Sequence, residues 1–233
     1  MITIEFRCEN KYIVSEQQLY LLDRQLSSLL RKDIHQTGKA YCIRSLYFDD
    51  PQNSRMEENH AGVDLRKKYR IRIYDPSQNT MHLEIKEKVH GLTRKSACDI
   101  TRDECLTLMD GRFPSEFDSR AVLNALKLEM RISRMRPAAI IDYERSAYIC
   151  PTGNVRITFD RNITVSTCCR AFLADKPSHL IPLLPTGMHV LEVKYDELIP
   201  DYILQVIQSI KPERTAFSKY YLGRLAAQSN FSY

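Results

Sequence analysis

A strict alternation of charged and apolar side chains over residues 66–74 constrains the fold of this chain more than any other feature. A β-strand turns successive side chains to opposite faces, so Lys68, Arg70 and Arg72 share one face and the intervening apolar residues share the other. Residues 82–88 alternate in the same way, after a turn signal at residues 75–77. The two stretches therefore predict a β-hairpin with one apolar face and one positively charged face.

The positive charge is concentrated in this hairpin and the strand after it. Residues 66–95 contain nine Lys or Arg and three Asp or Glu, whereas the whole chain of 233 residues has a net charge of only +5. Such a local excess predicts a surface that faces a polyanion, or else an unusually charged face in water.

The overall composition, 43% hydrophobic and 27% charged, is that of an ordinary folded protein. No repeat, linker or low-complexity segment interrupts the sequence, so we expect a single domain, residues 1–233. The seven cysteines contain no C-x-x-C pair and follow no signal peptide, which predicts reduced thiols and a cytoplasmic protein. The longest uncharged run, residues 177–191, contains three prolines and is shorter than the roughly 18 apolar residues of a membrane helix. We therefore expect no membrane segment in this chain.

Capping-box patterns begin two of the predicted helices, one at Ser15–Gln18 and one at Thr101–Glu104. The helices that we expect are residues 16–30, a short one ending near 58, 102–110, 115–131, and a helical region from 200 to about 221. The strands that we expect are residues 5–14, 41–48, 66–74, 82–88, 93–100, 137–149, 155–160, 163–169 and 189–195.

Several of these strands place charged residues on a single face. The sets are Glu9 with Lys11, Arg70 with Arg72, Glu84 with Lys86, Tyr143 with Arg145, Arg156 alone, and Glu192 with Lys194. One interpretation is an antiparallel sheet whose polar side lies in water. The other is a closed sheet, covered outside by the helices, whose charged face points inward and is compensated by a bound polyanion or metal. The dominance of Arg and Lys on these faces favours a basic tunnel for a multiply charged phosphate compound, with carboxylates that hold a divalent cation.

Six motifs in the same order carry a resemblance to a known family. They are Ser45-Leu46-Tyr47-Phe48-Asp49, Lys68-Tyr69-Arg70-Ile71-Arg72-Ile73-Tyr74, Leu83-Glu84-Ile85-Lys86, Tyr143-Glu144-Arg145, Arg156-Ile157-Thr158-Phe159-Asp160 and Leu191-Glu192-Val193-Lys194. The chain resembles the VTC (vacuolar transporter chaperone) domain, the catalytic domain of polyphosphate polymerases, in the triphosphate tunnel metalloenzyme superfamily. The resemblance extends from Glu9 to about Tyr221, and its strength lies in six motifs in register.

The resemblance implies an α+β fold, a closed antiparallel eight-stranded tunnel β-barrel with helices packed outside. It also implies an enzyme that transfers the terminal phosphate of ATP to a growing polyphosphate chain, with Mn²⁺ or Mg²⁺ as cofactor. ATP and inorganic polyphosphate are then the expected partners, and nucleic acid is not.

The resemblance and the charge pattern together assign the candidate site residues. The catalytic candidates are Lys11, Arg70, Arg72, Lys86, Arg145, Arg156 and Lys194. The substrate-binding candidates are Lys88, Lys95, Tyr143, Ser218 and Lys219. The metal-binding candidates are Glu192, Glu9 and Glu84. Arginines suit bidentate contacts with phosphate oxygens, so Arg70, Arg72 and Arg156, with Lys86, are expected to hold the triphosphate. Packing or simple hydrogen bonding is the alternative for Tyr143, and a helix cap with a solvated lysine is the alternative for Ser218 and Lys219.

The sequence also departs from the superfamily. Tunnel triphosphatases carry Glu-x-Glu-x-Lys on the first strand, whereas this chain has Arg7-Cys8-Glu9-Asn10-Lys11. Unless Arg7 faces solvent at the tunnel mouth, this exchange favours gripping phosphate over hydrolysis at a metal-rich site. The alternatives are a metal-dependent tripolyphosphatase or nucleoside triphosphatase, and a non-catalytic polyanion-binding module. The SPX domain and membrane helices of the eukaryotic complexes are not part of this sequence, so we expect a stand-alone, prokaryotic domain.

Overall fold

The chain is organised as two compact units, each assembled from three separate segments. The computed structural model describes residues 8–34, 36–75, 80–90, 92–112, 116 and 118–229. The first unit comprises Met1–Cys42, Tyr143–Ile163 and Leu184–Ser218, and the second comprises Ile43–Asp142, Thr164–Leu183 and Lys219–Tyr233. The expectation of a single domain stays a prediction.

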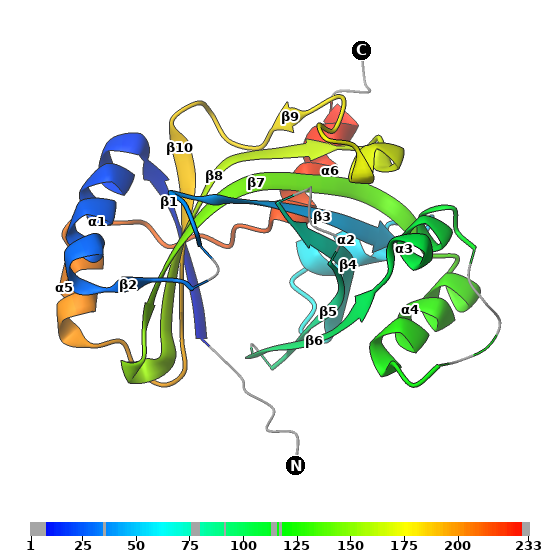
Figure 1. The fold of residues 1–233 in the computed structure, drawn as a ribbon, viewed down its shortest axis with the longest axis horizontal. Helices are drawn as coiled ribbons and strands as arrows, with labels where there is room; N and C mark the ends of the chain where they lie inside the picture. The colour runs from blue at the N-terminus through cyan, green and yellow to red at the C-terminus, as the bar shows by residue number, and fades with distance from the viewer. Residues whose placement is uncertain are drawn as a thin grey trace. The chain divides into compact units, whose positions relative to one another are not determined.

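Among the described residues, ten β-strands belong to one sheet. Figure 1 shows how these strands follow one another. They are β1 (Cys8–Ser15), β2 (Arg31–Lys32), β3 (Tyr41–Asp49), β4 (Arg66–Tyr74), β5 (Met81–Val89), β6 (Leu92–Ile100), β7 (Arg136–Cys150), β8 (Val155–Ser166), β9 (Ile181–Pro182) and β10 (Met188–Tyr195). The hydrogen-bonded order is β1-β10-β8-β7-β3-β4-β5-β6, with the two-residue strands β2 on β7 and β9 on β8.

The eight long strands confirm the α+β class and the antiparallel pairing, but the expectation of a closed barrel is not met. Within the described residues the strand order ends at β1 and β6 rather than returning on itself. Alternation along a strand reports which face is polar, whereas closure depends on whether the two end strands pair, and no local pattern encodes that.

Six α-helices and two short 3₁₀ turns accompany the strands among the described residues. They are α1 (Glu16–Leu29), α2 (Ser54–His60), η1 (Thr152–Asn154), η2 (Cys169–Leu173), α3 (Arg102–Met109), α4 (Ala121–Ile132), α5 (Asp201–Gln208) and α6 (Lys219–Ser229). Both predicted capping boxes are present: Ser15 with Gln18 begins α1, and Thr101 with Glu104 begins α3. No described helix is both long and apolar enough to cross a membrane.

The core of the first unit lies between two helices and the apolar face of its strands. Leu19, Leu22 and Leu26 of α1 pack with residues of α5 against β1, β7, β8 and β10. Helices α1 and α5 contact each other along this face (Figure 1). Because side chains alternate along each strand, the opposite face carries the charged residues of β1, β8 and β10.

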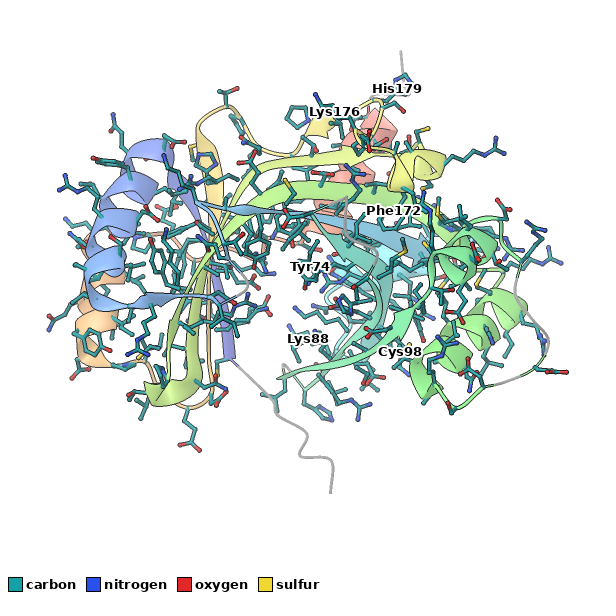
Figure 2. The ribbon with its side chains drawn as sticks, viewed as in Figure 1. Tyr74, Lys88, Cys98, Phe172, Lys176 and His179 are labelled. Carbon is teal, nitrogen blue, oxygen red and sulfur yellow. The ribbon has the colours of Figure 1, made fainter. Side chains whose placement is uncertain are left out.

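The core of the second unit packs α3 and α4 against the apolar face of β3–β6. Tyr69, Ile71 and Ile73 of β4 are all buried there, which confirms the predicted face of the hairpin. Figure 2 shows the side chains of Tyr74 and Lys88 on one side of these strands and Cys98 on the other, towards α4.

Three predicted elements differ from the structure. Residues 155–160 and 163–169 were expected as two strands, but one strand, β8, covers residues 155–166, with Asn162 in a left-handed conformation (φ 52°) at the predicted break; residues 167–169 lie beyond its end. The described part of residues 115–131 becomes helical only at Ala121. The helical region from 200 is two helices, because α5 ends at Gln208 and α6 begins at Lys219. Arg7 and the centre of the turn at residues 75–77 lie outside the described residues.

Substitution of Gly223 tests how closely α6 packs against β7 and β8. A Cβ at this position would lie 2.7 Å from Cδ1 of Ile141 and 3.1 Å from Cγ2 of Val165, both fully buried. Gly223→Ala gains about 1 kcal/mol of helix propensity, but overpacking costs about 1–3 kcal/mol. We therefore expect a net loss of stability of about 1 kcal/mol in denaturant unfolding. Gly38→Ala, where the Cβ meets only Ala40 O at 3.7 Å, is the control and should be neutral or stabilising. A Gly223→Ala protein more stable than the wild type would contradict this packing.

Candidate functional site

The polar face of β4–β6 in the second unit, here called the cationic face, is dominated by positive charge. The pairing register places Lys68 opposite Lys86, and Lys86 opposite Lys95, so three lysines lie side by side across three strands. The other cations of this face are Arg66, Arg70, Arg72 and Lys88, and its carboxylates are Glu84 and Asp99. Like charges directly opposite on neighbouring strands repel one another, and an anion bound between them relieves that repulsion.

The other face of the same three strands is balanced. Glu87 lies in register between Lys67 and Arg94 and forms ion pairs with both. The distance from Glu87 Oε1 to Lys67 Nζ is 3.0 Å. The charge excess is therefore a property of one face, and not of strands that are rich in Lys and Arg throughout.

Glu84 organises the cationic face. Its Oε2 atom lies 2.6 Å from Nη2 of Arg70 and 3.6 Å from Nη1 of Arg72, and its Oε1 atom lies 3.2 Å from Nζ of Lys95. Burial alone would raise the pKa of this carboxyl, which is only 2% exposed, but Arg70, Arg72 and Lys95 lower the pKa far below its ordinary value. Glu84 is therefore ionised and fixes the position of two arginines.

Arg70 is also held by Tyr47, which is itself supported by Tyr220. Its Nη1 donates a hydrogen bond of 2.9 Å to the Tyr47 hydroxyl, and the Tyr47 ring stacks on Tyr220 of α6 at 4.9 Å between centroids. Burial would raise the pKa of Tyr47, but Arg70 and Arg72 lower the pKa below its ordinary value of 10. The Tyr220 hydroxyl in turn donates to Asp49, so the arginine is supported through a chain of contacts.

Arg72 also contacts one residue of the neighbouring strand β3 and one residue of its own strand β4. Its Nε donates to Ser45 Oγ at 3.4 Å, and its guanidinium lies 5.9 Å from the Tyr74 ring centre. Ser45 and Tyr47 were not assigned a role from the sequence, although their alternation on β3 puts them in register with Arg72 and Arg70. Once the β3–β4 register is known, Ser45 and Tyr47 can be identified as partners of the two arginines.

The first unit carries a cluster of cations and carboxylates on β1, β7, β8 and β10, here called the mixed cluster. Its members are Glu9, Lys11, Arg145, Asp160, Glu192 and Lys194. Lys11 pairs in register with Glu192 and Glu9 with Lys194, so opposite charges face each other across β1 and β10. Lys11 Nζ lies 2.9 Å from Glu9 Oε1, and Lys194 Nζ lies 3.5 Å from Glu192 Oε1. Cation and carboxylate are balanced here, unlike on the cationic face.

Asp160 fixes Arg145 within this cluster. Arg145 Nε and Nη2 donate to the two carboxylate oxygens of Asp160 at 2.6 and 2.7 Å, and Asp160 is fully buried. The same Nη2 atom lies 3.4 Å from Glu192, and the guanidinium lies 5.3 Å from the Tyr143 ring centre. Asp160 was missed as a site residue because its role depends on Arg145, fifteen positions away on the neighbouring strand.

Glu9 and Glu192 form the part of the cluster that suits a divalent cation. Burial raises the pKa of Glu192, but the charges of Lys194 and Lys11 and a hydrogen bond with Glu9 lower the pKa well below its ordinary value. Two neighbouring carboxylates repel each other, and a divalent cation between them relieves that repulsion. Among the described residues, no group of three or more His, Cys, Asp or Glu is placed to hold a metal ion. Two carboxylates fit Mg²⁺ or Mn²⁺ when substrate phosphates supply further oxygens.

The remaining predicted residues lie on one or other unit. Arg156 Nη2 donates to Asp33 Oδ2 at 2.7 Å and to the Tyr41 hydroxyl at 3.2 Å, two partners that the sequence did not indicate. Lys219 begins α6, and its charge contributes to the lowered pKa of Tyr47. The expectations that Ser218 binds substrate and that all these side chains converge on one enclosed channel stay predictions.

A model of the VTC domain matches residues 6–227. The chain belongs to the VTC domain family. This confirms the family predicted from the six motifs, while the roles of the predicted site residues in this VTC domain stay predictions.

Two solved structures share the fold of this VTC domain. A candidate adenylate cyclase from Bacillus halodurans is 15% identical, with a TM-score of 0.54 over 92% of this chain and 94% of that one. A candidate adenylyl cyclase from Hippeastrum, described as having a dominant triphosphatase activity, is 14% identical, with a TM-score of 0.59 over 95% and 96%. At these identities the likeness establishes the fold alone. No curated protein sequence matches the chain.

Replacing Glu84 tests whether the cationic face is held together by this one carboxylate. Glu84→Gln leaves the cations around a buried position without their charge partner, so we expect a loss of about 3 kcal/mol in unfolding free energy at pH 7. Because the folded-state pKa of Glu84 lies below the unfolded value, this difference should shrink as the pH falls below about 4.5. Added tripolyphosphate should raise the melting temperature of Glu84→Gln more than that of the wild type. Equal shifts in the two proteins would contradict the role given to Glu84.

Proposed function

We propose that this VTC domain is a polyphosphate polymerase that transfers the terminal phosphate of ATP to a growing polyphosphate chain. The observation that carries the proposal is the row of Lys68, Lys86 and Lys95 across β4–β6, beside Arg70 and Arg72. Polyphosphate repeats a negative charge at every phosphate, so a row of cations matches the polymer along its length. The proposal is supported by membership in the VTC family and by this charge pattern.

Arg70 and Arg72 are the residues that we assign to the triphosphate. A guanidinium can contact two phosphate oxygens at once, and charge stabilisation is most effective when the donors are already in place before the reaction. Glu84, Tyr47 and Ser45 provide that placement through the contacts described above. We therefore assign Glu84 to positioning the arginines rather than to the metal.

Glu9 and Glu192 are the residues that we assign to a divalent cation. When bound, the cation would neutralise phosphate oxygens of the nucleotide and so lower the barrier to phosphoryl transfer. Arg145, fixed by Asp160, and the lysines Lys11 and Lys194 contribute further positive charge beside the two carboxylates.

The same charges favour a polymerase over a hydrolase. Hydrolysis requires an activated water, which in metal-dependent enzymes generally involves several carboxylates around one or two metals. In polymer growth the nucleophile is itself a phosphate oxygen, so cations that bring two polyanions together contribute more. The described residues offer the paired carboxylates Glu9 and Glu192 against a large set of Lys and Arg.

The deciding experiment incubates the pure protein with ATP, Mn²⁺ and a short polyphosphate primer, and measures ADP, free phosphate and polymer length on a gel. We expect ADP release to match chain growth, and Glu192→Gln to abolish both by weakening the cation site. Glu144→Gln, an exposed carboxyl on the opposite face of β7, is the matched control and should retain activity. Free phosphate equal to ADP with no polymer would establish a triphosphatase instead. Tight polyphosphate binding without turnover would establish a non-catalytic binding module.

Arginine variants test the assignment of the cationic face. Arg70→Ala or Arg72→Ala should remove about 2–4 kcal/mol of transition-state stabilisation, a fall of about 30- to 1000-fold in turnover. Arg94→Ala removes an arginine from the balanced face of the same strands and should leave turnover close to that of the wild type. If the Arg70 and Arg72 variants lose stability while their folded fraction turns over normally, the two arginines have a structural role only.

A further inference from the structure

A buried hydroxyl without a partner lies on the charged face of the first unit. Thr158 of β8 is 2% exposed, and its Oγ1 atom has no hydrogen-bond partner among the residues that the structure describes. Alternation along β8 places it between Arg156 and Asp160, on the face that carries the mixed cluster. Buried polar groups are nearly always paired, so an unpaired one calls for an explanation.

The register of the sheet puts this hydroxyl beside the paired carboxyls. Thr158 is directly opposite Glu192 on β10, and Glu192 is directly opposite Lys11 on β1. Directly opposite residues of antiparallel strands have Cβ atoms about 4.5–5.5 Å apart, so the Thr158 hydroxyl and the Glu192 carboxyl are neighbours. A threonine hydroxyl has two lone pairs and can bind a cation or accept a hydrogen bond.

Without nucleotide, Glu9 and Glu192 are the two carboxyls that supply protein oxygens to the cation site proposed above. Small divalent cations prefer about six oxygen ligands, so a further protein oxygen beside these carboxyls strengthens binding before the substrate arrives. Serine and threonine hydroxyls serve as ligands to such cations in other phosphate-transferring sites. We propose that Thr158 Oγ1 is a third protein oxygen of the divalent-cation site formed by Glu9 and Glu192. The inference rests on the cation part of the proposed function and not on the polymerase reaction.

A second buried hydroxyl, that of Ser146, helps to distinguish a cation ligand from a hydroxyl that is merely packed. Ser146 of β7 is also buried, at 3% exposed, and its Oγ atom also lacks a partner among the described residues. It follows Arg145 directly, so its side chain points to the opposite face of the strand, away from the carboxyls. The lack of a partner is therefore common to both residues, and only Thr158 adds proximity to Glu192.

The test measures Mn²⁺ binding to the full chain without nucleotide, by titration followed through the electron paramagnetic resonance signal of free Mn²⁺. Thr158→Val keeps the shape of the side chain but removes the hydroxyl, and we expect Mn²⁺ affinity to fall by at least about 10-fold. Thr158→Ser restores the hydroxyl and should restore affinity. Ser146→Ala is the matched control and should bind Mn²⁺ as the wild type does.

Thermal unfolding of the same proteins without metal separates a ligand from a structural residue. Because valine removes an unpaired buried hydroxyl, Thr158→Val should melt at the same temperature as the wild type or higher. Unchanged Mn²⁺ affinity in Thr158→Val, an equal loss in Ser146→Ala, or a loss that accompanies a lower melting temperature would overturn the inference. Wild-type protein that binds no Mn²⁺ would overturn it too. A protein that binds Mn²⁺ through Thr158 but makes no polymer would refute the polymerase proposal alone.

Discussion

Repulsion between the cations of β4–β6 is the constraint on which the second unit depends. Lys68, Lys86 and Lys95 lie directly opposite one another, an arrangement that costs roughly 0.2–1 kcal/mol for each adjacent pair. The reverse face of the same strands buries Tyr69, Ile71 and their neighbours under α3 and α4. Each such burial contributes about 1.5–3 kcal/mol, so the apolar face outweighs the repulsion. The sheet can therefore hold a concentration of charge that isolated strands would not.

The charges of the first unit are balanced, unlike those of the cationic face. In the mixed cluster each cation has a carboxylate beside it, and Arg145 is fixed by the fully buried Asp160. A balanced cluster gains little by binding a polyanion alone, whereas its neighbouring carboxyls, Glu9 and Glu192, suit a divalent cation. The cationic face, by contrast, gains from any multiply charged anion. The two units therefore carry two different electrostatic environments, one that suits a divalent cation and one that suits a polyanion.

The sequence predicted the faces of the strands but not the partners of their charges. Period-two alternation identifies Arg70 and Arg72 as facing away from the core without any tertiary information. Their partners Tyr47 and Ser45 become visible only with the β3–β4 register, and Asp33 lies 123 positions from the Arg156 side chain that it binds. Closure of the sheet and the continuity of β8 through Asn162 likewise depend on pairing rather than on local pattern. The motifs nevertheless identified the family, because each one contains the alternation of charged and apolar residues of one strand.

Burial on the cationic face differs between Lys95 and the two arginines Arg70 and Arg72. The Lys95 side chain is 55% exposed, whereas those of Arg70 and Arg72 are 15% and 9% exposed. Exposed charges attract a polyanion over about a Debye length of 8–10 Å and are screened by salt, so under the proposed function Lys95 would act mainly on encounter. The buried guanidiniums are screened far less and are fixed by Glu84, so under the same proposal they would act on the bound phosphate group. The proposal thus assigns attraction and recognition to different residues of one face.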